Sequence, residues 1–310
     1  MSTTEPILDT RVRSRQARHA EPDVAGLGVP RALAFLAPAI LLIGMFLVFP
    51  ALWTLYIGAT NYELTGPNSI APRFVGLGNL GTALSDPQFR NSLWLTVVFV
   101  VGSAVIGQNA LGFLLAVLLR RSARPMRAVG QALVLVAWIL PGTVVSFLWF
   151  ALLDRDAGTL NTLLGNHATA WLIQYPMTSL VVFNTWRGTA FSMLLYQSAL
   201  TAVPPTQLEM ARLSGARGWQ LLRDVVFPHI RGHVLTNTLL ITLWTANDFT
   251  PFLLTAGGPN HASEVLPVFI YNKALGSGEL GYASAISLLL LVLNLVIALV
   301  YLRLLRRRST

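Results

Sequence analysis

The sequence has no cysteine, a single lysine, and only 13 acidic residues among 310. Without cysteine, disulfides, thiolate catalysis and cysteine-ligated zinc are all excluded. The lone lysine, Lys273, is followed by alanine and lies outside any G-x-x-x-x-G-K-[ST] pattern, so the chain has no phosphate-binding loop of that kind. If the protein depends on ATP, another chain must bind the nucleotide.

Charge is also scarce. Charged residues make up 11% of the chain and hydrophobic residues 54%, with a mean hydropathy of +0.60. A soluble domain carries about 25% charged residues. The net charge of +9 does not indicate nucleic-acid binding, because the arginines lie in short runs between long apolar segments. The composition therefore predicts a protein whose surface largely faces lipid.

Six apolar stretches approach the roughly 20 residues that a membrane-spanning helix needs. The sequence therefore predicts an all-α polytopic membrane protein with about six transmembrane helices. Residues 1–30 are polar and predict a cytoplasmic N-terminal tail, followed by a transmembrane domain over 31–310. The six predicted spans cover roughly 33–58, 92–119, 128–153, 177–200, 232–254 and 282–303.

The basic residues are distributed unequally between the two sides of these spans. Seventeen of the 22 fall in the N-terminal tail, in the loops near 120–127 and 201–231, and after the last span. Four fall on the other side, and Arg187 lies within a span. Because cytoplasmic segments carry the excess of arginine and lysine, both termini are predicted to be cytoplasmic.

The loop at about 201–231 predicts a helical hairpin. Thr206 and Glu209 have the spacing of a capping box, Gly215 suits a left-handed turn after the first helix, and Pro228 is expected to close the second. Pattern alone leaves two interpretations open. The hairpin either passes the motion of a partner protein into the membrane, or lies on lipid headgroups.

The segment from Glu209 to Pro228 resembles the EAA loop of ABC importer permeases, with Met210 in place of the first alanine. In that family the loop is the coupling helix that docks into a groove of the ATPase subunit. The resemblance implies that this contact is made by Glu209, Ala211, Gly215 and Ala216.

A second motif narrows the resemblance. Leu254–Pro259 (L-T-A-G-G-P), followed by Ile270 and Tyr271, is similar to a signature of the maltose, lactose and glycerol-phosphate type of sugar permeases. Phe74–Asn79 and Asp86–Phe89 resemble the first periplasmic loop of these subunits. The resemblance covers roughly 33–305 and implies the type I ABC importer architecture in the cell inner membrane.

The resemblance also implies the partners. These are a second homologous permease subunit, two copies of an ABC ATPase that bind ATP and Mg, an extracytoplasmic solute-binding protein, a sugar substrate and membrane lipid. No cofactor is implied in this chain, and no enzymatic activity is expected of it.

Two ionisable residues fall within predicted spans, Arg187 near the middle and Asp248 in the outer half. An intramembrane charge is costly and predicts a function. The two side chains could pair with each other, or they could line a sugar path. Gln108 and Asn109, in the second span, are instead expected to bond neighbouring helices.

Two segments are similar to the substrate-lining segments of maltose-type permeases, Asn184–Phe191 and Trp244–Phe249. Arg187 stands where the maltose member has an apolar residue, which favours an acidic or differently hydroxylated sugar. The resemblance implies a substrate path formed by Asn184, Arg187, Gly188, Phe191, Thr245 and Asp248.

Two other functions are less consistent with the sequence. An ion-coupled secondary transporter would show internal repeats and several mid-membrane carboxylates, but Asp248 is the only one in a span. An integral membrane glycosyl or prenyl transferase needs clustered Asp, Glu or His. Only His229 and His233 have helical spacing, and no acidic residue completes a metal site, so no metal is expected.

Overall fold

The computed structural model describes residues 29–165 and 169–306. The predicted tail over 1–30 therefore lies almost entirely outside the described residues. The chain divides between Trp53 and Thr54 into two units. Neither described part contains a β-strand, although an isolated antiparallel bridge joins Thr60 and Phe74.

The first unit contains α1 (Val29–Ile43), the π-helical turn η1 (Gly44–Val48) and the start of α2 (Phe49–Gly58). Together these segments form an apolar helix, Leu33–Gly58, of 26 residues and mean hydropathy 2.5. A helix that is apolar on all sides and this long can cross a membrane.

The second unit is helical from the end of α2 onward. Its long helices are α5 (Pro87–Phe99) continuing through the π-helical η2 (Val100–Gln108) into α6 (Asn109–Arg121), then α7 (Arg124–Ile139), α8 (Gly142–Leu152), α11 (Pro176–Thr201), α14 (Phe227–Ala246) and α17 (Leu280–Arg306). The connections between these helices carry short helices, which are α3 (Pro67–Ile70), α4 (Gly78–Ser85), α9 (Thr159–Leu163), α10 (Trp171–Gln174), α15 (Thr250–Thr255), η4 (Pro259–His261), α16 (Leu266–Tyr271) and η5 (Asn272–Gly276).

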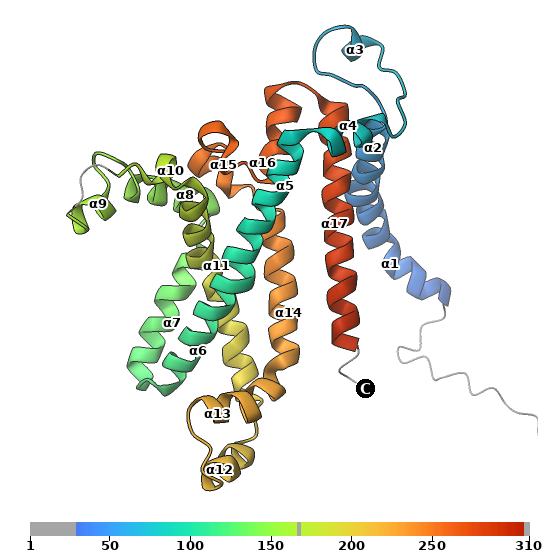
Figure 1. The fold of residues 1–310 in the computed structure, drawn as a ribbon. Helices are drawn as coiled ribbons and strands as arrows, with labels where there is room; N and C mark the ends of the chain where they lie inside the picture. Colours follow the sequence, from blue (N-terminus) through green and yellow to red (C-terminus); the bar gives the residue numbers. More distant parts are fainter. Residues whose placement is uncertain (1–28, 166–168, 307–310) are drawn as a thin grey trace, which may run out of the picture. The chain divides into compact units, whose positions relative to one another are not determined.

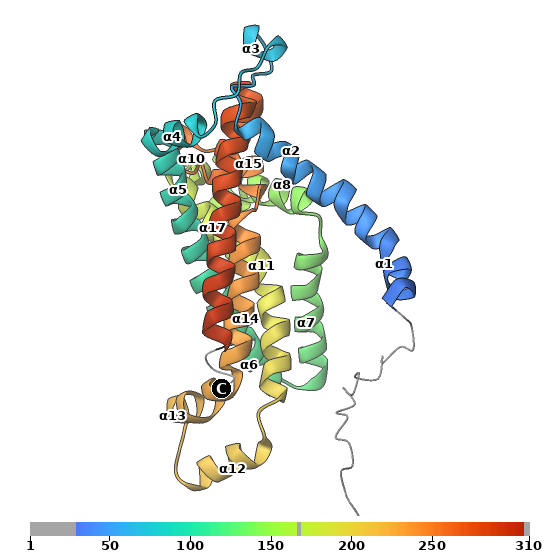
Figure 2. The same cartoon turned by 90° about the vertical axis from the view of Figure 1, so that its right-hand side faces the viewer.

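Helix α11 is the centre of this bundle, packing against η2, α6, α7 and α14 (Figures 1 and 2). Glycines on η2 and α6 allow the close approach. A β-carbon at Gly107 would lie 2.2 Å from Oγ1 of Thr185, and one at Gly112 would lie 2.5 Å from Cβ of Ser192. Small residues let membrane helices come close enough for their backbones to pack, so α6 and α11 fit together with little space between them.

Of the six predicted spans, three coincide with single helices long and apolar enough to cross a membrane, and a fourth does so only as a bent pair of helices. The helices Leu33–Gly58, Pro87–Arg121 and Leu280–Arg306 are long and apolar enough to cross a membrane. Helices α7 and α8 meet that standard only together, and they bend by 103° at their junction, so the predicted continuous span 128–153 was wrong. The span 232–254 was also predicted as continuous, but α14 ends at Ala246 and α15 begins at Thr250.

Helices α11 and α14 are 26 and 20 residues long, yet they are not among the most apolar helices. Many of their polar side chains are buried, for example Asn184, Ser192 and Asn237. Polar groups in such helices face the interior of the bundle, where they can find partners. These buried polar side chains account for the lower hydropathy of α11 and α14, which are not among the helices apolar enough to cross a membrane by that standard.

The loop between α11 and α14 forms the predicted hairpin, from α12 (Pro205–Leu213) through α13 (Trp219–Leu221) and the π-helical η3 (Leu222–Val226). It lies at the end of the bundle opposite α10, α15 and α16 (Figure 1). Gly215 has a φ of +87°, as predicted. The capping box did not form, because Pro205 starts the helix before Thr206 and no side chain caps it.

Pro228 does not close the second helix of the hairpin, contrary to the prediction. The backbone stays helical from η3 into α14, with Pro228 in the first turn of α14. The hairpin is thus joined to α14 without a break.

Candidate functional site

A cavity of about 210 Å³ opens between η2, α7, α11 and α14, and we call it the path cavity. It gathers polar and aromatic side chains from segments far apart in the sequence. The lining residues are Gln108, Trp138, Asn184, Arg187, Gly188, Ile241, Trp244, Thr245 and Asp248.

The two intramembrane charges form an ion pair in this cavity. Nη1 of Arg187 lies 3.2 Å from Oδ2 of Asp248, and the same nitrogen donates to Oγ1 of Thr250 at 3.0 Å. The Arg187 side chain is 30% exposed and that of Asp248 15%. Pairing lowers the cost of holding both charges in the bundle.

The pair lies where both broken helices meet. Asp248 is in the gap between α14 and α15, and its Oδ1 accepts from the backbone N–H of Thr250 at 3.1 Å. Arg187 reaches the start of α8, where a β-carbon at Gly142 would lie 2.9 Å from Nη2 of the guanidinium. Arg187 therefore connects α11 with the break before α8 and with the break before α15.

Asn184 is buried in a network of hydrogen bonds. Its side-chain nitrogen donates to Oγ of Ser103 at 2.7 Å and to Oγ1 of Thr245 at 3.2 Å. Its backbone carbonyl oxygen accepts from Nε2 of Gln108 at 2.9 Å. Gln108 thus bonds a neighbouring helix, as predicted, and also lines the cavity. The network fixes Asn184 and Thr245 side by side.

Phe191 is the one predicted path residue that does not line the cavity. It packs behind the lining, with its ring centroid 4.7 Å from that of Trp244 and 6.1 Å from that of Trp138. Five of the six predicted residues, Asn184, Arg187, Gly188, Thr245 and Asp248, are therefore brought together, and the sixth supports their aromatic neighbours.

Sequence reasoning missed Trp138, Ile241 and Trp244 as lining residues. A signal for Trp138 was present, because Pro141 follows it closely, and a proline in a span predicts a break that can open a cavity. Trp244 begins the segment Trp244–Phe249, which resembles a substrate-lining segment, but it was not itself predicted to line the path. Ile241 gave no chemical signal, because an isoleucine in a span is expected to be packed.

The four predicted coupling residues lie on the hairpin. Glu209 and Gly215 are exposed, whereas Ala211 and Ala216 are half-buried. The N–H of Ala216 donates to the carbonyl of Ala211 at 2.9 Å, which closes the turn. The hairpin also carries a local ion pair, in which Nε of Arg223 donates to Oδ1 of Asp224 at 2.6 Å. This hydrogen bond holds the pKa of the Asp224 carboxyl below its usual value.

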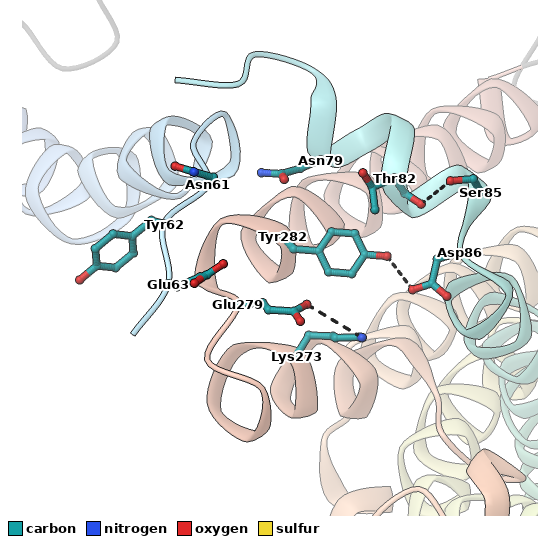
Figure 3. Close-up of a pocket in the computed structure, with 10 residues that line it drawn as sticks. All are labelled: Asn61, Tyr62, Glu63, Asn79, Thr82, Ser85, Asp86, Lys273, Glu279 and Tyr282. Atoms are coloured by element: carbon teal, nitrogen blue, oxygen red, sulfur yellow. Dashed lines mark hydrogen bonds and ion pairs between the residues drawn. The ribbon is translucent and has the colours of Figure 1, made fainter. Parts of the chain in front are cut away.

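Another cavity, of about 350 Å³, lies at the opposite end of the bundle from the hairpin, and we call it the outer cavity (Figure 3). Tyr282 donates to Oδ2 of Asp86 at 2.8 Å across it, and Nζ of Lys273 lies 3.9 Å from Oε2 of Glu279. Glu63 adds a further carboxylate to the lining. The outer cavity therefore carries more negative than positive side chains.

Within the part of the chain that the structure describes, no group of three His, Asp or Glu side chains is arranged to hold a metal ion.

Comparison with known proteins identifies the class. Residues 108–310 match the family described as the inner membrane component of binding-protein-dependent transport systems. The chain belongs to this family of transport-system permeases. Its place is in the inner membrane, as the family description states.

Two relatives resemble nearly the whole chain. The inner membrane ABC transporter permease protein YcjO of Escherichia coli is 30% identical over 86% of this chain and 90% of its own length. The trehalose transport system permease protein SugA of Mycobacterium tuberculosis is 29% identical, with 95% of each chain covered.

The fold agrees with this membership. A chain of a bacterial ABC transporter that imports the acidic polysaccharide alginate superposes with a TM-score of 0.75, at 20% sequence identity, over 90% of this chain and 96% of its own. A bacterial alginate transporter in complex with a periplasmic protein bound to an alginate pentasaccharide matches equally well, with a TM-score of 0.75. The architecture is thus that of ABC importer transmembrane subunits.

Proposed function

We propose that this chain is one of two permease subunits of an ATP-driven sugar importer, and that the path cavity is its half of the translocation route. The observation that carries the proposal is the convergence of Asn184, Arg187, Gly188, Thr245 and Asp248 on one polar cavity in the centre of a transport-family bundle. Phe191 supports the aromatic wall.

The chemistry of this cavity suits a polyhydroxylated substrate. Amide, hydroxyl and carboxylate groups exchange hydrogen bonds with sugar hydroxyls, and the rings of Trp138 and Trp244 offer apolar faces to a pyranose. A relative named for trehalose transport supports a saccharide. Because Asp248 already neutralises Arg187, we propose a neutral sugar in place of the acidic one that Arg187 alone favoured.

The hairpin is the proposed docking point for the ATPase, through Glu209, Ala211, Gly215 and Ala216. The small side chains at its bend leave room for another backbone. The helical connection through η3 gives a direct route for displacement from the hairpin into α14. ATP and Mg would be bound by two ATPase copies, and this chain would carry no catalytic residue.

The distribution of arginines supports placing the hairpin and both termini in the cytoplasm, with 1–30 as a tail and 31–310 as the permease domain. The outer cavity then faces the extracytoplasmic binding protein, and its carboxylates would meet basic side chains of that partner. A second, homologous permease subunit would complete the route.

The test is site-directed crosslinking in the assembled complex. The chain lacks cysteine, so an Ala216→Cys variant takes up a photoreactive maleimide probe at one position only. On illumination we expect an adduct with the ATPase subunit. Ala123→Cys, in the exposed loop between α6 and α7, is the matched control and should give none.

A Gly215→Pro variant should abolish the Ala216 adduct, because its φ of +87° is closed to proline. If an inserted, stable Ala216→Cys protein labels only lipid, the assignment of the hairpin as the ATPase contact is wrong. Uptake of labelled disaccharides into vesicles, driven by ATP, tests the substrate class separately.

A further inference from the structure

A cavity of about 400 Å³ lies where the hairpin meets the end of α6, and we call it the interfacial cavity. Most of its lining is apolar and comes from α6, α11 and both helices of the hairpin: Phe113, Val117, Leu200, Leu208, Leu221, Leu222 and Val226. Gly218 and three arginines, Arg120, Arg121 and Arg212, complete the lining.

These three arginines are not neutralised by acidic neighbours. None of the ion pairs between described residues includes them, and no Asp or Glu lines the cavity. Nη1 of Arg120 donates to the carbonyl of Leu200 at 2.7 Å, which fixes its guanidinium at the cavity. Arg223, close by on the hairpin, differs because it is paired with Asp224. The interfacial cavity therefore has a strong positive charge.

The position of the cavity matches a membrane boundary. Arg120 and Arg121 are the last residues of the apolar helix Pro87–Arg121, which is long enough to cross the bilayer. Arginines at the end of such a helix extend toward the headgroups. From Arg120 the apolar lining continues inward to Phe113, about 10 Å along the helix.

We propose that the interfacial cavity binds one anionic phospholipid, with its phosphate at the three arginines and the upper part of an acyl chain along Phe113 and Val117. Inorganic phosphate would contact the arginines but leave the apolar wall exposed. A neutral lipid would cover the apolar wall but leave the charge of the arginines unbalanced. Basic pockets between membrane helices suit anionic headgroups for the same reason.

Such a lipid would touch α6 and both helices of the hairpin at once. It would therefore bias the position of the hairpin relative to the bundle. Lipid binding at this cavity would be independent of the substrate.

The experiment measures lipid retention by native mass spectrometry of the whole importer complex in a non-ionic detergent. Phosphatidylglycerol and phosphatidylcholine with identical acyl chains are added in turn. We expect tight retention of one phosphatidylglycerol per copy of this chain and much weaker retention of phosphatidylcholine. The double variant Arg121→Gln/Arg212→Gln should weaken the retention of phosphatidylglycerol about tenfold or more.

The matched control is Arg124→Gln/Arg217→Gln. It removes the same charge from neighbouring positions of the two loops, but neither residue lines the cavity. Binding should stay within about twofold of the unmodified complex. The conservative double variant Arg121→Lys/Arg212→Lys keeps the charge and should retain most of the binding, which separates charge loss from misfolding.

Three outcomes would overturn the proposal. Equal losses in the glutamine variant and its control would show diffuse surface attraction. Displacement of the lipid by excess inorganic phosphate would indicate a free-phosphate site. Equal retention of phosphatidylcholine would show that the arginines do not select the headgroup.

Discussion

Gly188 faces the side chain of Gln108 so closely that a β-carbon at position 188 would lie 2.2 Å from Cδ of the amide. The same amide donates to the carbonyl of Asn184, one turn earlier on α11. The two helices are therefore joined at the path cavity by a contact that only glycine permits. This contact fixes the polar wall of the cavity.

Because Gln108 lies so close to position 188, a methyl group there should lower the stability of the protein. Gly188→Ala should destabilise the complex by about 1–3 kcal/mol, because the methyl group must displace Gln108. Gly232→Ala on α14 is the control, since a β-carbon there meets nothing within 4 Å. Thermal unfolding in detergent measures both, and adding Gln108→Ala to Gly188→Ala should restore part of the loss. If the two glycine variants melt alike, the close contact is wrong.

Because Arg187 and Asp248 form an ion pair, the stability changes of variants at these two positions should not be additive. Arg187→Gln or Asp248→Asn alone leaves one charge half-buried without its partner, so each should lower stability by about 1–2 kcal/mol. The double variant should lose less than the sum of the two, because neither charge remains. Unfolding of the four proteins gives the coupling energy. A coupling near zero would mean that the two charges do not interact in the complex.

Removal of the Asn109 side chain should lower stability through the loss of buried hydrogen bonds. Its side-chain oxygen accepts from Tyr196 and from Nδ2 of Asn237, the latter at 2.9 Å, in the interior between α6, α11 and α14. Asn109→Ala should cost about 1–3 kcal/mol, because these donors lose a buried acceptor. Asn247→Ala, at an exposed amide, is the control and should cost less than about 1 kcal/mol. Equal melting temperatures would contradict the network.

Asp86 has two roles that variants can separate. It caps α5 by accepting from the N–H of Gln88 at 2.8 Å, and it accepts from Tyr282 in the outer cavity. Asp86→Ala removes both and should cost about 1 kcal/mol or more. Tyr282→Phe removes only the second bond and should be milder. If binding-protein affinity falls with Asp86→Asn, which keeps the cap, the outer carboxylates contribute to docking through their charge.

The sequence predicted the helical class and singled out five of the residues that line the path cavity, because membrane burial leaves strong signals. Arg187 and Asp248 stand out in apolar spans, where an ionisable group needs a partner, and the structure brings them within 3.2 Å. Trp138 and Ile241 could not be assigned in this way, because aromatic and aliphatic residues are common on every face of a span.

The proline positions show why the local geometry was harder to predict. A proline inside a helix clashes with the carbonyl four residues earlier, so Pro228 was expected to end a helix. The π-helical η3 directly precedes α14, and its wider turn shifts those carbonyls. Pro141, in contrast, stands at the 103° bend. The helix therefore continues through Pro228 but breaks at Pro141, although both residues are prolines.

The unbroken helical path from η3 into α14 has a mechanical consequence. Helix α14 is 20 residues long, or about 30 Å, and it ends at the gap that contains Asp248. The first non-helical residues after α14 begin at Asn247, and Asp248 in this gap is paired with Arg187. A displacement of the hairpin passed along α14 would therefore arrive at the Arg187–Asp248 pair, at the end of the helix opposite the hairpin.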